Sequence, residues 1–423
     1  MKRKLTAMIL VILMLLSACM RMNEETEKKD PATPETDQSA QAQEVQTGSD
    51  GPAAQAGEKN DLQPAEPGPE PPPGPEPEPE PEPQPVFTEI TITAAGDNLL
   101  HNTVSNSCKT ESGFDFRPLY RFIKDIIEPS DIAFINQEIM LTGEVSAYPR
   151  MAAPAEVADA LIDTGFNVIN LATNHTLDKG EKGLEACLEN VKERPFDAVL
   201  GAFLTEEESK TPILVTKKGV TFGFLSYTYD MNGYSLSAGN EWKVSLIDRK
   251  KITREMNEIR PLCDYLIVSM HWGVEYQHTP TSSQKDYAKL LCELGADLII
   301  GTHAHVLQPL EILTSSDGSR STICIYSLGN FISNQQRIAT MLGGILEVKL
   351  VFDEDNKPVS QEACVIPTVT HYTVGSKEFA IYPLSEYTEE LAESHGIKKH
   401  DKPLTMDYLD SLAEEVLGDA VKK

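Results

Sequence analysis

Short apolar segments alternate with amphipathic ones along most of the chain, and this pattern restricts the fold more than any other feature. Buried strands are typically short apolar or β-branched runs, and their alternation with helices favours a layered α/β sheet covered on both faces. We predict strands at 89–95, 131–135, 166–171, 197–201, 220–226, 264–270, 297–301, 323–328 and 344–352, and helices at 155–164, 180–194, 248–262, 282–295 and 406–417.

The residues before this pattern have a different character. Lys2, Arg3 and Lys4 precede an apolar run that is short for a bilayer span, and the run ends in a Leu-Ser-Ala-Cys sequence that resembles the bacterial lipobox. A polar tract rich in Glu and Pro follows, whose composition cannot bury enough apolar surface to fold. We therefore predict a lipoprotein signal peptide at 1–18, lipidation of Cys19, an acidic tether at 19–85, a folded domain at 86–352 and a C-terminal extension at 353–423.

Polar side chains follow directly after several predicted strands. Ligands bind outside the carboxyl ends of the strands in open α/β sheets, so these side chains are expected to converge. A single histidine after a strand is most often structural, but five such segments in phase indicate a shared site. Imidazole and carboxylate donors together suit Zn, Mn or Fe. The residues concerned are Asp97, His101, Glu138, Asn174, His175, Asp178, His271, Glu275, His303 and His305.

Six motifs of this chain resemble, in order and spacing, those of the CapA family. That family is linked to the synthesis and export of poly-γ-glutamate capsule, and its fold is that of calcineurin-like metallophosphatases. The resemblance covers about residues 88–350 and implies a metallophosphatase-type sheet sandwich flanked by helices. The motifs are Gly96-Asp97-x₃-His101, Asn136-x-Glu138, Asn174-His175-x₂-Asp178-x-Gly180, His271-Trp272-Gly273-x-Glu275-Tyr276, Gly301-x-His303-x-His305-x₂-Gln308 and Tyr326-Ser327-Leu328-Gly329-Asn330-Phe331.

The resemblance implies a role for each matching residue. Two divalent ions would be held by Asp97, His101, Glu138, Asn174, His271, His303 and His305. His175 matches the acid that protonates a leaving group, and Asp178 would orient it. Glu275, Arg150, Gln308 and Asn330 are expected around the ligands or the substrate. The chain departs from the phosphatase pattern at Leu99, where a histidine ligand is usual, and His101 is the candidate substitute.

Charge and cysteine content restrict the partners. The net charge is −28 and the folded part remains acidic, which argues against nucleic acid as a partner. Six scattered cysteines after Cys19 form no C-x-x-C pair, so most are expected to be buried thiols, with one disulfide left open. The expected partners are an anionic polymer such as poly-γ-glutamate or a surface phosphoester, the membrane through the lipid anchor, and a membrane synthase complex.

Three functions are compatible with these features. The chain is a surface component of poly-γ-glutamate capsule synthesis or export, a metal-dependent hydrolase of phosphoesters or γ-glutamyl amides, or a polymer-binding scaffold without catalysis. The first can coexist with either of the others, and fold analogy alone does not choose among them.

Overall fold

The computed structural model describes Gly68 and residues 86–422. The predicted signal peptide, Cys19 and all of the predicted tether except Gly68 lie outside these residues. Among the helices in residues 86–422, none is long and apolar enough to cross a membrane.

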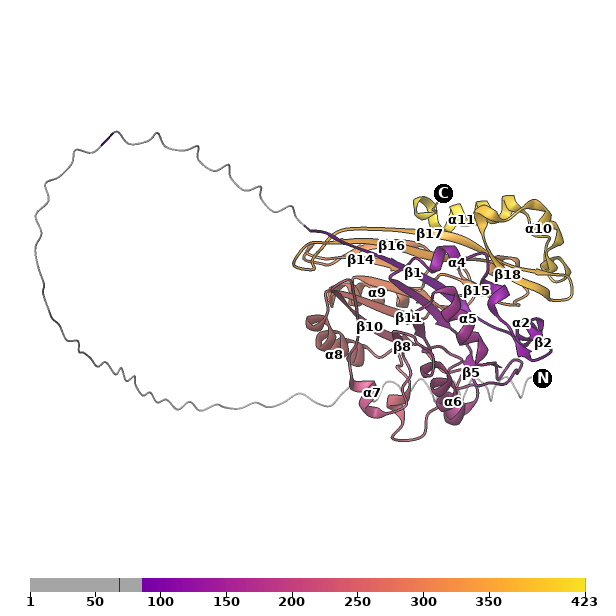
Figure 1. Cartoon of the computed structure of the whole chain (residues 1–423), viewed down its shortest axis with the longest axis horizontal. Helices are drawn as coiled ribbons and strands as arrows, with labels where there is room; N and C mark the ends of the chain where they lie inside the picture. The colour runs from indigo at the N-terminus through magenta and orange to yellow at the C-terminus, as the bar shows by residue number, and fades with distance from the viewer. Residues whose placement is uncertain (1–67, 69–85, 423) are drawn as a thin grey trace, which may run out of the picture. The chain divides into compact units, whose positions relative to one another are not determined.

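The larger sheet joins strands from both ends of the described chain (Figure 1). Its first strand pairs in parallel with the next one along the sheet and antiparallel with a late strand. The strand order is β18 (Lys377–Pro383), β17 (Pro358–Thr373), β16 (Leu342–Phe352), β1 (Thr88–Asn98), β4 (Ile132–Gln137), β7 (Val168–Asn170) and β8 (Ala198–Leu200), and β15 (Asn330–Ile332) also pairs with β1.

The second sheet has a parallel centre with an antiparallel strand at each edge. Its order is β13 (Leu310–Thr314), β14 (Ser321–Ile325), β12 (Leu298–Thr302), β11 (Tyr265–His271), β10 (Val220–Thr228) and β9 (Ile213–Lys217). Two short ribbons accompany the sheets, one of β2 (Lys109–Thr110) with β3 (Gly113–Phe114) and one of β5 (Met140–Leu141) with β6 (Ala152–Ala153).

The alternation of side chains along β11 shows how the layers are built. Tyr265 and Ile267 belong to the core that the two sheets share, whereas Leu266 and Val268 belong to a second core on the outer face. Because successive side chains of a strand point to opposite faces, the continuous apolar run of β11 fills both cores. The outer core is completed by α8 (Arg249–Ile259) and α9 (Ser282–Glu293), which cover the second sheet.

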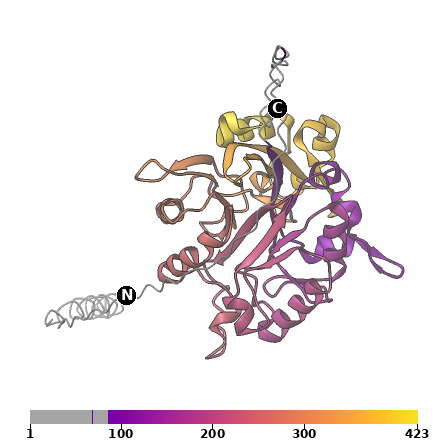
Figure 2. The same cartoon turned by 60° about the vertical axis from the view of Figure 1, so that its left-hand side comes forward.

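The remaining helices lie outside the sheets (Figure 2). All strands and helices predicted from the sequence are present, with ends that differ by a few residues at most. The layered α/β sandwich is therefore confirmed. The helices outside the sheets, besides α8 and α9, are α2 (Asn102–Ser107), α3 (Arg117–Tyr120), α4 (Lys124–Ile127), α5 (Glu156–Thr164), α6 (Gly180–Lys192), α7 (Glu206–Lys210), α10 (Glu389–Ser394) and α11 (Met406–Leu417).

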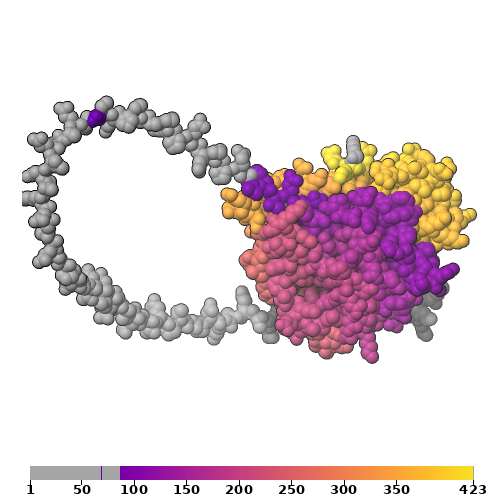
Figure 3. Space-filling view, viewed as in Figure 1, coloured from indigo at the N-terminus to yellow at the C-terminus, as the bar shows by residue number. Residues whose placement is uncertain are grey.

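The C-terminal residues take a larger part in the fold than their sequence suggests. We expected one helix in 353–423, and it is present as α11, but β17 and β18 were missed. β17 pairs with β16 along most of its length, and its polar outward positions and internal Pro367 conceal the strand pattern. Leu409 and Leu412 of α11 join the main core. Figure 3 shows the C-terminal residues (yellow) continuous with the rest of the surface.

Two glycines allow backbone segments to approach closely beside the polar strand ends. A Cβ atom on Gly96 would lie 2.1 Å from the Gly329 carbonyl oxygen, and one on Gly301 would lie 2.0 Å from that of Tyr326. No real Cβ atom tolerates such contacts, so only glycine fits at either position. Gly96 directly precedes Asp97, and Gly301 lies two residues before His303.

The cysteine prediction also holds for the described residues. Cys108, Cys187, Cys292 and Cys324 are buried free thiols. Cys263 and Cys364 are free and partly buried. No disulfide forms among the cysteines of residues 86–422.

Candidate metal centre

The carboxyl ends of strands from both sheets bring the predicted ligands together. Asp97 lies near the end of β1, Glu138 follows β4, and Asn174 follows β7 in the larger sheet. His271 ends β11, and His303 follows β12 in the second sheet. The His303 backbone N–H lies 3.2 Å from both carboxylate oxygens of Asp97, a contact between residues 206 positions apart. The site is thus built where the two sheets meet.

Three groups of donors are close enough to hold divalent ions. Within each group, one candidate ligand atom from each residue lies within 4.8 Å of the others. Glu138 is common to two groups, the position that a carboxylate shared by two ions would take. Among residues 86–422, these groups are Asp97, Glu138 and His305; Glu138, His271 and His303; and Glu275, His303 and His305.

Buried atoms without partners test whether a cation fits. Both carboxylate oxygens of Glu138 and Nδ1 of His303 have no hydrogen-bond partner among the described residues, although both side chains are buried. Burial raises the pKa of Glu138 well above its ordinary value, and the nearby Asp97, Glu275 and Asp178 raise it further against the opposing effect of His305. An unpaired buried carboxylate is costly. A metal ion at Glu138 would remove that cost, so the donor set fits a metal.

The imidazoles of His305 and His271 are held by neighbouring polar groups. His305 Nδ1 lies 3.0 Å from Asn330 Oδ1 and 3.2 Å from Asp97 Oδ2, so this nitrogen donates and Nε2 points toward Glu138 Oε1 at 3.6 Å. Burial opposes a charge on His305, but Glu138 and Asp97 raise its pKa to about 9. His271 Nε2 lies 2.9 Å from Asn174 Oδ1, and Thr302 holds its Nδ1. Contacts such as those of Asn330 and Thr302 orient metal-binding histidines.

The His-x-His segment has an unusual backbone. His303 and His305 have φ angles of 91° and 59°, a region that residues other than glycine adopt rarely and at a cost of roughly 1–3 kcal/mol each. Burial lowers the pKa of His303 to about 3, and His305 and His175 lower it in addition, so its imidazole is neutral at neutral pH. A neutral imidazole with a free nitrogen is the form that binds metal. The strained backbone is thus found at two histidines that belong to the same donor group.

His175 and Asp178 form a separate pair beside the donor groups. His175 Nδ1 lies 2.8 Å from Asp178 Oδ2, and its Nε2 lies 4.0 Å from Glu138 Oε1. The Met151 backbone N–H also donates to Asp178 Oδ2 at 2.8 Å. Arg150 donates from Nε to the backbone oxygen of Asp178 at 2.8 Å. The orienting contact expected between His175 and Asp178 is therefore present, and the free nitrogen of His175 faces the donors.

Residues behind Asp97 form a hydrogen-bond chain that sequence reasoning did not assign. Asn136 Nδ2 donates to Asp97 Oδ1 at 2.8 Å, and Asn170 Nδ2 donates to Asn136 Oδ1 at 2.7 Å. Ser226 Oγ donates in turn to Asn170 Oδ1. All four residues are buried, and the chain runs across four strands, β1, β4, β7 and β10, to fix the position of the Asp97 carboxylate. Asn136 and Asn170 lie at the ends of β4 and β7, so their position after predicted strands could have marked them as site residues.

The loop after β10 contributes two more residues that were missed. The ring of Tyr229 lies 4.5 Å from that of His303, centroid to centroid. Asn232 Oδ1 accepts from Asn174 Nδ2 at 3.1 Å, and its Nδ2 lies 3.2 Å from His175 Nδ1. This loop also leaves the carboxyl end of a predicted strand. The rule that selected the other motifs applies to it equally.

Three further predicted residues have the following surroundings. His101 belongs to none of the donor groups formed by residues 86–422, and its Nδ1 lies 3.2 Å from both Leu99 O and Asn334 N. Gln308 bonds to Gln277 and Gln284 and thereby holds a loop. Glu275, expected around the ligands or the substrate, has its carboxylate within a donor group.

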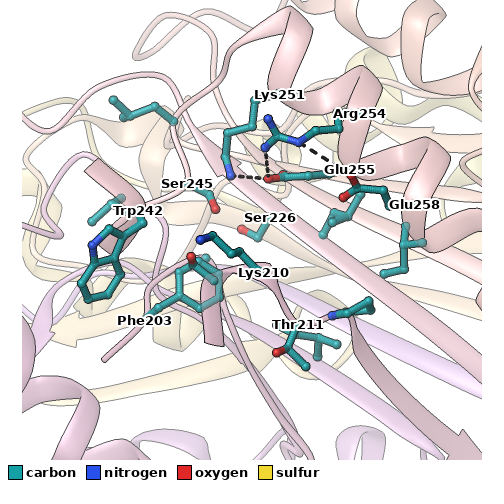
Figure 4. Close-up of a pocket in the computed structure, with 18 of the residues that line it drawn as sticks. Phe203, Lys210, Thr211, Ser226, Trp242, Ser245, Lys251, Arg254, Glu255 and Glu258 are labelled. Atoms are coloured by element: carbon teal, nitrogen blue, oxygen red, sulfur yellow. Dashed lines mark hydrogen bonds and ion pairs between the residues drawn. The ribbon is translucent and has the colours of Figure 1, made fainter. Parts of the chain in front are cut away.

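A hollow of about 800 Å³ lies away from the donor groups, against β10 and α8. Figure 4 shows Lys251 and Arg254 directed toward Glu255, and the distances are 2.5 and 3.3 Å. Tyr227 also donates to Glu255, at 2.8 Å. These cations are neutralised within the protein, so the hollow is not built to attract an anion. Ser226, at the end of the chain behind Asp97, is one of its lining residues.

Comparison with known sequences identifies the family. The family described as "Bacterial capsule synthesis protein PGA_cap" matches residues 91–335, more than half of the chain. The chain belongs to this family. It is 30% identical over 224 residues to the PGA biosynthesis protein CapA of Bacillus subtilis (strain 168), covering 51% of this chain and 57% of that protein. It is 29% identical over 259 residues to the capsule biosynthesis protein CapA of Bacillus anthracis, covering 58% and 60%. The PGA_cap chain thus spans somewhat more than half the length of these relatives.

Solved structures similar to this PGA_cap protein include nucleotidases and phosphoesterases. A 5'-nucleotidase precursor from Thermus thermophilus is 13% identical, with a TM-score of 0.42 over 66% of this chain and 54% of the other. The calcineurin-like phosphoesterase YfkN from Bacillus subtilis is 14% identical, with a TM-score of 0.37 over 66% and 91%. Values this low describe a distant likeness, and no reaction follows from them.

Proposed function

We propose that this PGA_cap protein serves poly-γ-glutamate capsule synthesis or export at the cell surface through a metal-dependent hydrolytic centre. The observation that carries the proposal is the shared position of Glu138 in two donor groups, with neither of its buried oxygens hydrogen-bonded within residues 86–422. The family and the CapA relatives supply the biological setting. The chemistry is argued from the residues of this chain.

Two donor groups would each hold one divalent ion. Asp97, Glu138 and His305 form the first, and Glu138, His271 and His303 form the second, which Asn174 would join through its amide oxygen. A pair of divalent ions bound there would polarise the substrate bond and lower the pKa of a bound water. The hydrogen-bond chain through Asn136 orients the Asp97 carboxylate toward the ion position.

His175 distinguishes a hydrolytic site from a scaffold. Its Nδ1–H donates to Asp178, so Nε2 is the nitrogen that meets a substrate beside Glu138. A proton held at that nitrogen can pass to the leaving group, which is the role of a general acid. A site that only bound a polymer would gain nothing from a buried carboxylate that orients this imidazole. We therefore favour hydrolysis over the scaffold.

The substrate is an anionic surface molecule, either a phosphoester or a γ-glutamyl chain. The folded part is acidic, so metal ions and local cations must attract such a substrate. Arg150 is exposed and bonded to the backbone of Asp178, and Arg337 lies 4.3 Å from the ring of Tyr276. Both guanidinium groups are held beside segments of the site and are the cations we assign to substrate attraction.

The purified protein should contain close to two equivalents of Mn, Zn or Fe when prepared without chelator, and it should hydrolyse either a phosphodiester or γ-glutamyl oligomers. Elemental analysis and the two turnover assays measure this directly. Removal of the metal should abolish turnover, and its return should restore it. Metal content well below one equivalent, with no binding of added metal, would leave the scaffold function in place. If only the phosphodiester or only the γ-glutamyl oligomer is hydrolysed, that result identifies the substrate class.

The surface location is also part of the proposal and rests on the lipobox-like sequence before Cys19. Acyl chains on this cysteine would anchor the protein firmly, because two or more chains together resist dissociation. Replacing Cys19 with Ala is expected to shift the protein from the membrane fraction to the medium or to leave it unprocessed. Fractionation and immunoblotting measure this. A variant that stays membrane-bound at the wild-type processed size would refute the anchor.

A further inference from the structure

Glu275 occupies a position that the metallophosphatase pattern does not explain. It lies in the loop after β11, is exposed, and brings a carboxylate oxygen within 4.8 Å of ligand atoms of His303 and His305. Its charge also acts inside the site, since it raises the pKa of the buried Glu138 in addition to the larger effect of burial. From the sequence we expected Glu275 around the ligands or the substrate. The structure places its carboxylate on the solvent side of the two histidines.

The loop that carries Glu275 is fastened to the His-x-His segment. The Tyr276 backbone N–H donates to Ala304 O at 2.8 Å. His278 Nδ1 donates to Leu307 O at 2.9 Å, and Gln308 Nε2 donates to Gln277 O at 2.7 Å. These three bonds involve the three residues that follow Glu275, and each joins the loop to the segment 304–308. Tyr276 has a φ of 66°, so its backbone is held in a rarely adopted conformation.

Contacts of the Tyr276 side chain hold the same loop from its outer side. The Arg337 guanidinium lies over the Tyr276 ring at 4.3 Å, and Gln335 Nε2 donates to the Tyr276 hydroxyl at 3.3 Å. A carboxylate on so constrained a loop needs little further ordering to reach a ligand position. Preorganisation of this kind is what metal-binding positions require.

One donor position is open for such a residue. The metallophosphatase pattern places a histidine where this chain has Leu99, which is buried. His101, the expected substitute, is absent from every donor group of residues 86–422, and its Nδ1 already has two backbone neighbours. Without a replacement, the group of Asp97, Glu138 and His305 offers only three protein donors.

We propose that Glu275 is a direct metal ligand, which binds an ion together with His303 and His305. Its exposed carboxylate would approach that ion from the solvent side of the two histidines. A carboxylate in place of an imidazole makes the set richer in oxygen, which shifts its preference toward Mn and away from Zn. This inference rests on the proposed metal centre and adds a ligand to it.

Substitution of Glu275 with Cys tests direct coordination, because a thiolate bound to Co²⁺ gives an intense near-ultraviolet charge-transfer band. The purified variant, loaded with Co²⁺ and kept reduced, should show this band over the wild-type spectrum. His101→Cys should not show it. Glu354→Cys, on an exposed turn remote from the site, is the matched control for an added surface thiol.

Glu275→Gln provides the second measurement. It should weaken the binding of one of two Co²⁺ or Mn²⁺ ions at least tenfold by titration calorimetry, while His101→Gln leaves both affinities unchanged. A Glu275→Cys protein that binds Co²⁺ without the band, together with wild-type affinity in Glu275→Gln, would overturn the assignment of Glu275 alone. A wild-type protein that binds no Co²⁺ would overturn the metal centre and the ligand together. Metal binding without turnover would count only against the hydrolytic function.

Discussion

Replacing Glu138 with Gln is expected to weaken metal binding by more than about 100-fold and to abolish turnover. Glu138 belongs to two donor groups, so its loss removes a ligand from both ions at once. Changes that touch a metal only through its ligands already cost about 10- to 100-fold in affinity. A bridging carboxylate should therefore exceed that range. Elemental analysis and calorimetric titration of the purified variant measure the effect.

The same variant should separate metal loss from unfolding. Neither carboxylate oxygen of Glu138 has a hydrogen-bond partner among residues 86–422, so an uncharged amide of the same shape breaks no hydrogen bond. The metal-free variant should therefore melt at or above the temperature of the metal-free wild type. Glu255→Gln is the matched control, because Glu255 pairs with Lys251 and Tyr227 away from the site. It should lower the melting temperature and leave metal binding intact. The reverse pattern would refute a ligand role for Glu138.

The sequence predicted the centre of this fold well for a physical reason. The inner strands are buried on both faces, and β11 is buried throughout and begins with the apolar run Tyr265–Val268, so its pattern is hard to mistake. β17 lies toward the sheet edge, is exposed over its first residues and contains Pro367, so its sequence resembles an irregular segment. Its strand character comes from pairing with β16, a contact that local sequence does not report.

The same division applies to the site. Asp97, Glu138, His271, His303 and His305 converge because strand ends meet at one edge, and strand ends can be read from sequence. The positions of His101 and Glu275 depend on how their loops fold back, which the pattern does not encode. The loop with Glu275 is set by hydrogen bonds to a segment about 30 residues away, including the one from Tyr276 to Ala304. Sequence reasoning therefore could not give their distances from the donors.

The replacement of His175 with Ala should produce a different result from the loss of any ligand. His175 is assigned to proton transfer and not to the ions, so the variant should keep its metal while turnover falls by about 10²–10⁴-fold, the usual contribution of a general acid. Asp178→Asn should act in the same direction, because Asp178 accepts the Nδ1–H that orients the ring. Metal content and turnover are measured on the same preparation.

The dependence on the leaving group makes this test specific to a proton donor. A p-nitrophenolate leaves without a proton, whereas an alkoxide or an amine needs one. His175→Ala should therefore lose much less activity on a p-nitrophenyl ester than on an alkyl ester or a γ-glutamyl amide. A structural role for His175 would reduce turnover of all substrates by the same factor. An equal loss across leaving groups, or loss of metal together with activity, would therefore remove His175 from the role of acid and leave Nε2, 4.0 Å from Glu138, as a further candidate ligand.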